Sequence, residues 1–150
     1  MNIFILDRDP RLAAQYHCDK HVVKMILESA QMLSTVAGVG YKPTHVNHPC
    51  TKWVRESYGN ALWLFKLTMY LNEEYCKRYG GEFHKSCDVA SRAFAQIMRQ
   101  RDGMPRGLTP FALAMPDEYK CDDPVQAYRD FYKGDKAHFA KWRNGAPDWW

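Results

Sequence analysis

The chain has 150 residues, of which 46% are hydrophobic and 25% are charged, and its formal net charge is +4. This composition is that of an ordinary globular protein and does not favour a disordered chain, and the longest apolar runs are too short to span a membrane. The length favours a single helical domain over residues 1–150, and the mildly basic charge permits nucleic-acid binding without requiring it. The five cysteines form no Cys-x-x-Cys pair and no secretory signal precedes them, so we expect reduced thiols and a cytoplasmic location.

The first part of the chain predicts an extended arm followed by a long helix. Residues 2–6 are a short apolar run, which we interpret as a strand or an extended arm that lies against helices. Asp9 followed by Pro10 is typical of a helix start. The predicted helix continues to Ser34 or Ala37, where glycines follow.

The rest of the chain predicts further helices. A second helix begins at Pro49 and continues to the glycine pair at 80–81, with a bend at Gly59. A third helix starts at Ser86 as its N-cap and ends before Gly103. After these come an irregular segment over 105–116, a short helix from Pro124 to Gly134 and a last turn over 135–142. The sequence therefore predicts a mainly α fold, a compact single-domain bundle of four to five helices with a short N-terminal extended segment.

Positions about 100° apart divide the first predicted helix into a polar and an apolar face. The polar face carries His17, Lys20, His21, Lys24 and Glu28. Lysines next to histidines disfavour a metal ion and suit an anionic ligand such as a phosphate. A solvated helix face, with pairs such as Lys24 and Glu28 four residues apart, explains the same pattern.

Asp19 falls by the same angles within the apolar face of this helix. A buried carboxylate needs a cation or several hydrogen-bond donors. Asp19 is therefore either a structural tie, for example to an arginine, or a carboxylate of a functional site.

Polar residues also interrupt the apolar side of the second helix at its start. Glu56 and Asn60 lie there near Trp53, and a glutamate in an apolar setting suits a general acid or base. The positive end of its own helix stabilises such a glutamate equally well.

The loop before this helix is rich in hydrogen-bonding side chains, His45, Asn47 and His48. A loop of this kind at a helix N-terminus predicts an anion or ligand site. Capping of the helix by Asn47 or His48 is the alternative.

Two stretches resemble a known family. "GYKPTHVNHPCTKW", followed by "YLNEEYCKRYG", is similar to a pattern in the pyrimidine-dimer DNA glycosylase (endonuclease V-like) family, over residues 40–84. The chain as a whole resembles small, largely uncharacterised bacteriophage proteins, for which the cytoplasm would be that of the host.

The glycosylase resemblance implies a compact all-helical protein that binds duplex DNA and cleaves an N-glycosidic bond. The family's nucleophile is the amine of the first residue after Met removal, paired with a glutamate on the first helix. Here the second residue is Asn, which is too large for ready removal of Met1, and the position of that glutamate falls near Lys20. The resemblance thus implies an imine-forming amine at Met1, Lys20 or Lys24, with Asp19 or Glu56 stabilising the cationic sugar.

Three classes of function stay open. The leading hypothesis is a DNA- or nucleotide-acting, glycosylase-like hydrolase with Lys20, Asp19, Glu56 and His48 as catalytic residues. Its predicted substrate-binding residues are His17, His21, Lys24, His45, Asn47, Trp53 and Asn60. The alternative is a non-catalytic module that binds nucleic acid, a nucleotide or a host protein, and the second alternative is a metal-dependent hydrolase or nuclease using histidines and Asp19. The leading hypothesis involves no cofactor, no metal and no membrane, and the sequence leaves the oligomeric state unknown.

Overall fold

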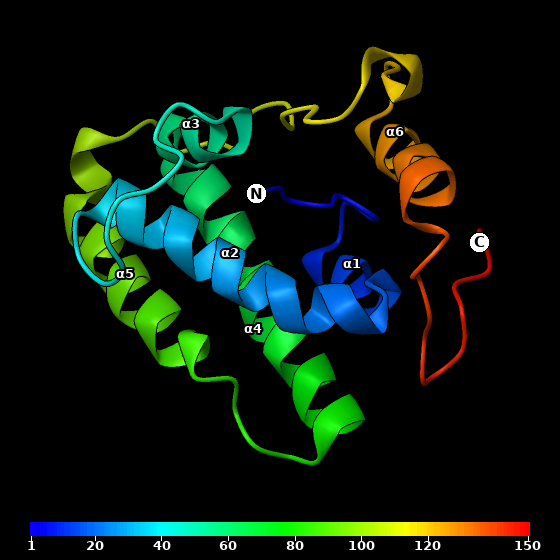
Figure 1. The fold of residues 1–150 in the computed structure, drawn as a ribbon. Coiled ribbons are helices and arrows are strands. Elements are labelled where there is room, and N and C mark those ends of the chain that lie inside the picture. The colour runs from blue at the N-terminus through cyan, green and yellow to red at the C-terminus, as the bar shows by residue number, and fades with distance from the viewer.

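The computed structural model describes all 150 residues and contains six α-helices and no β-strand (Figure 1). The helices are α1 Pro10–Tyr16, α2 Asp19–Ala37, α3 Pro49–Glu56, α4 Tyr58–Tyr79, α5 Ser86–Gln100 and α6 Pro124–Phe131. Short helical turns cover Arg101–Gly103, Asp117–Tyr119 and Tyr132–Lys136. The predicted mainly α fold is confirmed, with six helices where four to five were expected. None of these helices has both the length and the apolar character that crossing a membrane requires.

Helix α2 lies at the centre of the helix packing. It contacts α3, α4 and α5, while α1 packs against α4 (Figure 1). A hydrophobic core of 32 buried residues connects these helices with α6 and with the start of the chain. Because neighbours cover most of α2, its exposed residues are confined to one narrow stripe, Lys20, Lys24 and Leu27.

Residues 1–6 form an extended segment, the N-terminal arm, which confirms the predicted arm against helices. The arm runs antiparallel to α2. The Asn2 amide N–H donates to Glu28 Oε2 at 3.1 Å, and the Phe4 ring stacks on His21 with the ring centres 4.5 Å apart. Every residue of the arm after Asn2 is buried. The burial of this arm fixes the start of the chain against the middle of α2.

The single helix predicted from residue 10 onward is divided in the structure, which corrects that prediction. His17 and Cys18 have extended backbone, with ψ of 132° and 162°, and separate α1 from α2. Neither residue is a glycine or a proline, so no local signal marks the break. Arg78, from the end of α4, donates to the carbonyl oxygens of Gln15 and His17 at 3.0 and 2.7 Å. This distant side chain satisfies backbone groups that the end of α1 leaves free.

The second predicted helix is divided at Ser57 and is not simply bent at Gly59. The Ser57 hydroxyl accepts the Asn60 amide N–H at 3.0 Å and so caps α4. Gly59 allows a close approach, because a Cβ atom there would lie 2.7 Å from the Arg106 carbonyl oxygen. The segment 105–116 is irregular, as predicted, and it packs against the first turn of α4.

The C-terminal part of the chain packs back onto α1. Helix α6 starts at the predicted Asp-Pro pair, and the Asp123 side chain accepts the Val125 amide N–H at 3.0 Å. The Trp142 indole N–H donates to the Tyr16 carbonyl oxygen at 2.8 Å, and the Trp149 ring meets the Tyr16 ring edge-on. These contacts place the last residues beside the break between α1 and α2.

Candidate active site

The amine of Met1 lies beside Glu28, a glutamate in the middle of α2. The Met1 nitrogen is 3.6 Å from Glu28 Oε2, and the same oxygen accepts the Asn2 amide N–H at 3.1 Å. Lys24 Nζ lies 3.6 Å from the other carboxylate oxygen, Oε1. The Glu28 side chain is only 9% exposed, so these three donors stabilise a carboxylate that is largely withdrawn from water.

Met1 presents its main-chain end to solvent. Its side chain is 3% exposed although the residue as a whole is half-buried, so its accessible surface belongs mostly to main-chain atoms. The next residue is anchored firmly: Asn2 Nδ2 donates to the Ala114 carbonyl oxygen at 2.8 Å, and Asn2 Oδ1 accepts the Ile3 amide N–H at 2.8 Å. An amine on an anchored chain next to a carboxylate is an arrangement that suits a nucleophilic amine.

The start of α3 borders the same pair of groups. The Cys50 amide N–H donates to His48 Nδ1 at 3.1 Å, and Cys50 Sγ donates to Asn2 Oδ1 at 3.4 Å. Burial, followed by the positive charge of the Met1 amine, lowers the pKa of His48. Because Nδ1 accepts a hydrogen bond, the neutral ring carries its proton on Nε2. Capping of this helix by His48 is thus confirmed, while its catalytic role stays a prediction.

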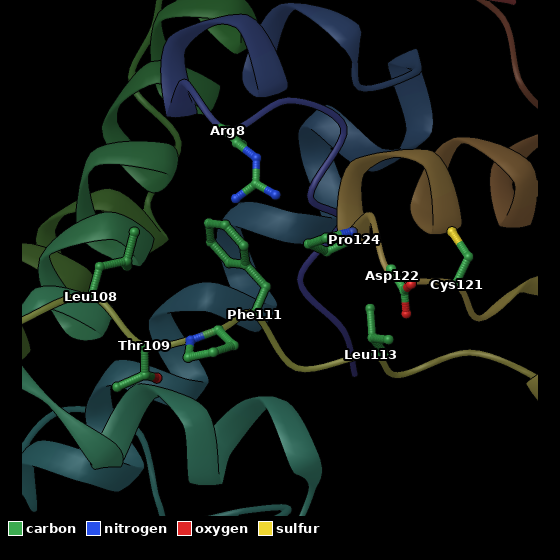
Figure 2. A pocket seen from close by; sticks show the side chains of 9 residues that line it. Arg8, Leu108, Thr109, Phe111, Leu113, Cys121, Asp122 and Pro124 are labelled. Carbon is green, nitrogen blue, oxygen red and sulfur yellow. The ribbon is translucent and has the colours of Figure 1, made fainter.

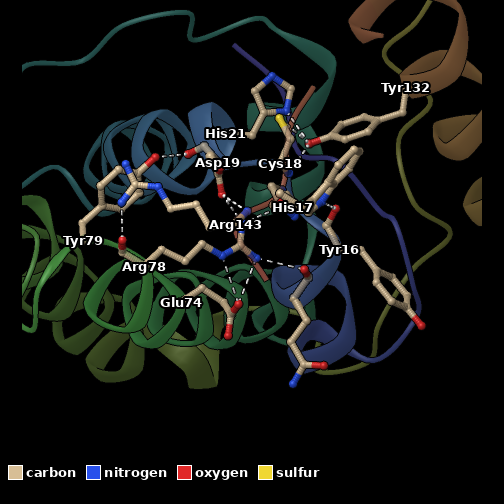
Figure 3. A network of polar contacts seen from close by, with 12 residues as sticks. Tyr16, His17, Cys18, Asp19, His21, Glu74, Arg78, Tyr79, Tyr132 and Arg143 are labelled. Carbon is tan, nitrogen blue, oxygen red and sulfur yellow. Dashed lines mark hydrogen bonds and ion pairs between the residues drawn. The ribbon is translucent and has the colours of Figure 1, made fainter. Parts of the chain in front are cut away.

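Asp19 is held by an arginine (Figure 3). Arg78 Nη1 lies 3.2 Å from Asp19 Oδ1, and Arg78 Nη2 lies 2.9 Å from Glu74 Oε1. The Arg143 amide N–H donates to the same Asp19 oxygen at 3.1 Å, and the Asp19 amide N–H donates to the Lys141 carbonyl oxygen at 2.8 Å. These contacts confirm the structural tie to an arginine, and none of them joins Asp19 to the Met1 amine.

His17 and His21 are buried, which corrects their expected position on a polar face, while their role in substrate binding stays a prediction. His17 is 0% exposed and His21 is 5% exposed. His17 Nδ1 donates to the Ala13 carbonyl oxygen at 2.6 Å, and His21 Nδ1 lies 2.6 Å from the Tyr132 hydroxyl oxygen. The break between α1 and α2 places His17 outside both helices, and the Phe4 ring of the N-terminal arm stacks on His21, so both rings lie in the core.

Burial of these histidines predicts that mild acid destabilises the fold. Burial is the largest cause that lowers the pKa of His17 from 6.5 to about 4 and the pKa of His21 to about 2. Between pH 6.5 and about 4 the unfolded chain binds protons that the folded protein excludes, so the free energy of unfolding decreases as the pH falls. His17 alone accounts for a decrease of about 3 kcal/mol over this range. Urea unfolding at several pH values measures the effect, and a constant free energy between about pH 7 and 4.5 would contradict it.

Glu28 is the candidate that sequence reasoning missed. The sequence pairs Lys24 with Glu28 on an exposed face, and the pair exists, but Glu28 is only 7% exposed as a residue. The apolar run at 2–6 is the one sequence signal that points to this site. An arm buried along α2 necessarily places the start of the chain against that helix.

Trp53 and Asn60 are buried and make structural contacts, and their role as substrate-binding residues stays a prediction. They are 3% and 0% exposed. Asn60 Nδ2 donates to the Trp53 carbonyl oxygen at 2.7 Å, and Trp53 Nε1 donates to the Thr109 carbonyl oxygen at 3.4 Å. Glu56 is exposed, and its carboxylate accepts a hydrogen bond from the Thr109 hydroxyl at 2.8 Å. This group of side chains holds the segment 105–116 against α3 and α4.

Only two of the predicted site residues interact with the Met1–Glu28 pair. Lys24 does so by its contact with Glu28, and His48 by the effect of the Met1 charge on its ring. Lys20, His45, Asn47 and Glu56 are exposed and stay predictions. No three His, Cys, Asp or Glu side chains are arranged to hold a metal ion, so the residues named for the metal-dependent alternative are not gathered in one place.

A separate cavity of about 590 Å³ lies between the segment 108–113 and the start of α6 (Figure 2). Arg8 and Phe111 line it, together with Cys121 and Asp122 from the residues before α6. None of the predicted site residues contributes to its walls. The cavity is therefore distinct from the Met1–Glu28 pair.

The matched part of the sequence coincides with this candidate site. The sequence profile of a family described as pyrimidine dimer DNA glycosylase matches residues 1–89, which is more than half of the chain. No curated protein and no solved structure matches the chain. The match covers the N-terminal arm, Glu28 and α3, and it extends the resemblance seen over residues 40–84 to the start of the chain. The chain belongs to the pyrimidine dimer DNA glycosylase family.

Proposed function

We propose that this protein is a DNA glycosylase that attacks the damaged nucleotide with its amino-terminal amine, with Glu28 as the paired carboxylate. The 3.6 Å contact between the Met1 nitrogen and Glu28 Oε2 is the observation that carries this proposal. Membership of the family supports action on DNA, and the family description makes a pyrimidine dimer the proposed substrate.

The proposed reaction takes place at C1′ of the deoxyribose. The neutral amine forms a bond to C1′, the glycosidic bond breaks, and its electron pair leaves with the base, which takes up a proton. The attacking nitrogen loses its protons, one of them to Glu28, and the ring oxygen O4′ leaves C1′ with a proton, which yields an imine. Water then hydrolyses the imine and releases the amine. Glu28 also stabilises the positive charge that develops on the sugar, and its low exposure strengthens this interaction.

The amine of Met1 is the proposed nucleophile, because Asn2 is too large for ready removal of the residue before it. The Asn2 nitrogen lies 3.1 Å from the same Glu28 oxygen. The carboxylate would therefore also serve a chain that begins at Asn2. The intact mass of the purified protein identifies which residue carries the amine.

Borohydride trapping tests the proposal, because borohydride reduces an imine to a stable amine. With a duplex that contains a pyrimidine dimer, we expect a covalent adduct that peptide mapping places on the amino-terminal peptide. The same duplex without the dimer is the control and should give no adduct. An adduct on the peptide with Lys20 or Lys24 would contradict the proposed nucleophile. The absence of both adduct and base release would contradict the glycosylase itself.

A further inference from the structure

We propose that Lys20, Lys24 and Lys136 form a phosphate-binding surface, the lysine surface, that holds the backbone of a DNA strand beside the Met1–Glu28 pair. The inference rests on the proposed function for the identity of the strand as part of the substrate. Lys136 lies outside the region that the family profile matches, so the C-terminal part of the chain contributes to the surface.

Lys136 reaches the N-terminal arm from the turn that follows α6. Its Nζ lies 5.9 Å from the centre of the Phe4 ring and 4.9 Å from the centre of the Phe131 ring. Aromatic faces attract an ammonium group and restrict its position. The carboxylate of the neighbouring residue Asp135 accepts a hydrogen bond from the Tyr119 hydroxyl at 2.8 Å. It forms no ion pair with Lys136.

The two lysines of α2 complete the surface. Lys20 and Lys24 lie one helical turn apart on the exposed stripe of α2. Lys20 Nζ lies 5.5 Å from the centre of the Phe139 ring, and that ring meets His21 edge-on with the ring centres 5.3 Å apart. The Phe4 ring stacks on the same histidine, so the aromatic contacts of Lys20 and Lys136 converge on one place.

The buried ring of His21, which is uncharged, lies beneath the ammonium groups of the lysine surface. Burial lowers the pKa of His21 most, and the charges of His17, Lys136 and Lys24 lower it further. Lys136 Nζ contacts the Phe4 ring that stacks on this histidine, and Lys24 follows His21 by three residues in α2, so both ammonium groups lie on its side of the molecule. The Phe4 and Phe139 rings, which both contact this histidine, add apolar surface, and charges near apolar surface act more strongly on an anion than they would in bulk water.

The lysine surface is not neutralised by acidic residues of the protein. Lys20 and Lys136 take part in no ion pair, and Lys24 shares Glu28 with the amine of Met1. Among these four cationic groups only Met1 and Lys24 have an acidic partner, and they share one carboxylate, Glu28, in a chain whose formal net charge is +4. Such a concentration of positive charge attracts an external polyanion, which neutralises it on binding.

The spacing of the surface fits a DNA strand. From Lys20 to Glu28, α2 advances about 12 Å, because each helical residue adds about 1.5 Å. One strand of duplex DNA presents a phosphate every ~3.4 Å along the axis, so about three phosphates face this length. A nucleotide whose C1′ is bonded to the Met1 amine has one phosphate on its 5′ side and one on its 3′ side. In the proposed complex, the strand on one of these two sides passes over the lysine surface.

The salt dependence of DNA binding tests this inference separately from catalysis. Binding of Lys136→Gln and wild type to an undamaged duplex is measured at several salt concentrations by fluorescence anisotropy. We expect the slope of log Kd against log salt to decrease by about one unit, because one phosphate contact is lost. The affinity for a duplex with a pyrimidine dimer should fall by the same factor, and Lys136→Arg should retain the wild-type slope.

Lys66→Gln is the matched control. Lys66 lies on the exposed stripe of α4, the helix whose other side packs against α2. An unchanged slope for Lys136→Gln, or an equal decrease for Lys66→Gln, would overturn the lysine surface. A decreased slope for Lys136→Gln alone supports it even if borohydride trapping fails, so the two proposals are tested independently.

Discussion

Glu28→Gln is expected to slow base release from a duplex with a pyrimidine dimer by about 100-fold or more. The amide has nearly the shape of the carboxylate but cannot accept the proton of the attacking amine or balance the charge on the sugar. The amine, at 3.6 Å from Oε2, would then have no carboxylate beside it. Single-turnover measurement of base release at saturating enzyme isolates this step from DNA binding.

Two further variants make the result specific. Glu73→Gln changes a glutamate of α4 that is 52% exposed, and we expect the wild-type rate. Glu56→Gln changes one of the two carboxylates predicted from the sequence for this role, the other being Asp19, and we expect the wild-type rate for it as well. If Glu28→Gln releases base within about threefold of the wild-type rate while its melting temperature is unchanged, Glu28 is not the paired carboxylate.

Arg78→Met is expected to lower the free energy of unfolding by about 3–5 kcal/mol, because it leaves buried charges without their partner. Arg78 is 1% exposed and is the cation that lies between Asp19 and Glu74 (Figure 3). The substitution also removes the donors to the carbonyl oxygens of Gln15 and His17 at the end of α1. Chemical denaturation followed by circular dichroism measures the loss.

Arg92→Met is the matched control, since Arg92 pairs with Asp88 on the surface of α5 and is 65% exposed. An exposed pair of this kind contributes less than about 1 kcal/mol. A similar loss for both variants would mean that the Arg78 network has no special part in stabilising the break between α1 and α2.

Local sequence signals predicted the helices well at their starts. Asp9 with Pro10, Pro49, and Asp123 with Pro124 all begin helices in the structure. These signals are reliable because a capping side chain and a proline act on backbone groups only two or three residues away. The same reasoning failed at His17–Cys18, where the break depends on Arg78, which lies far along the chain.

The N-terminal arm explains most of the error in the predicted polar face. With one continuous helix from Pro10, the residues His17, His21 and Glu28 share an exposed face with the lysines. In the structure Lys20, His21, Lys24 and Glu28 all lie on the single helix α2, so the break leaves their relative directions unchanged. The N-terminal arm covers the side of this face that carries His21 and Glu28, so these two are buried and Lys20 and Lys24 stay at the surface.

By itself, the sequence determined the helical class, the starts of the helices and the resemblance to a glycosylase family, because each depends on residues close together in the chain. It also identified Asp19 as a carboxylate in need of a cation. Only the tertiary structure decided that Arg78 is that cation and that Glu28 meets the amine of Met1. Contacts of this kind form when packing brings distant segments together, and no local pattern encodes them.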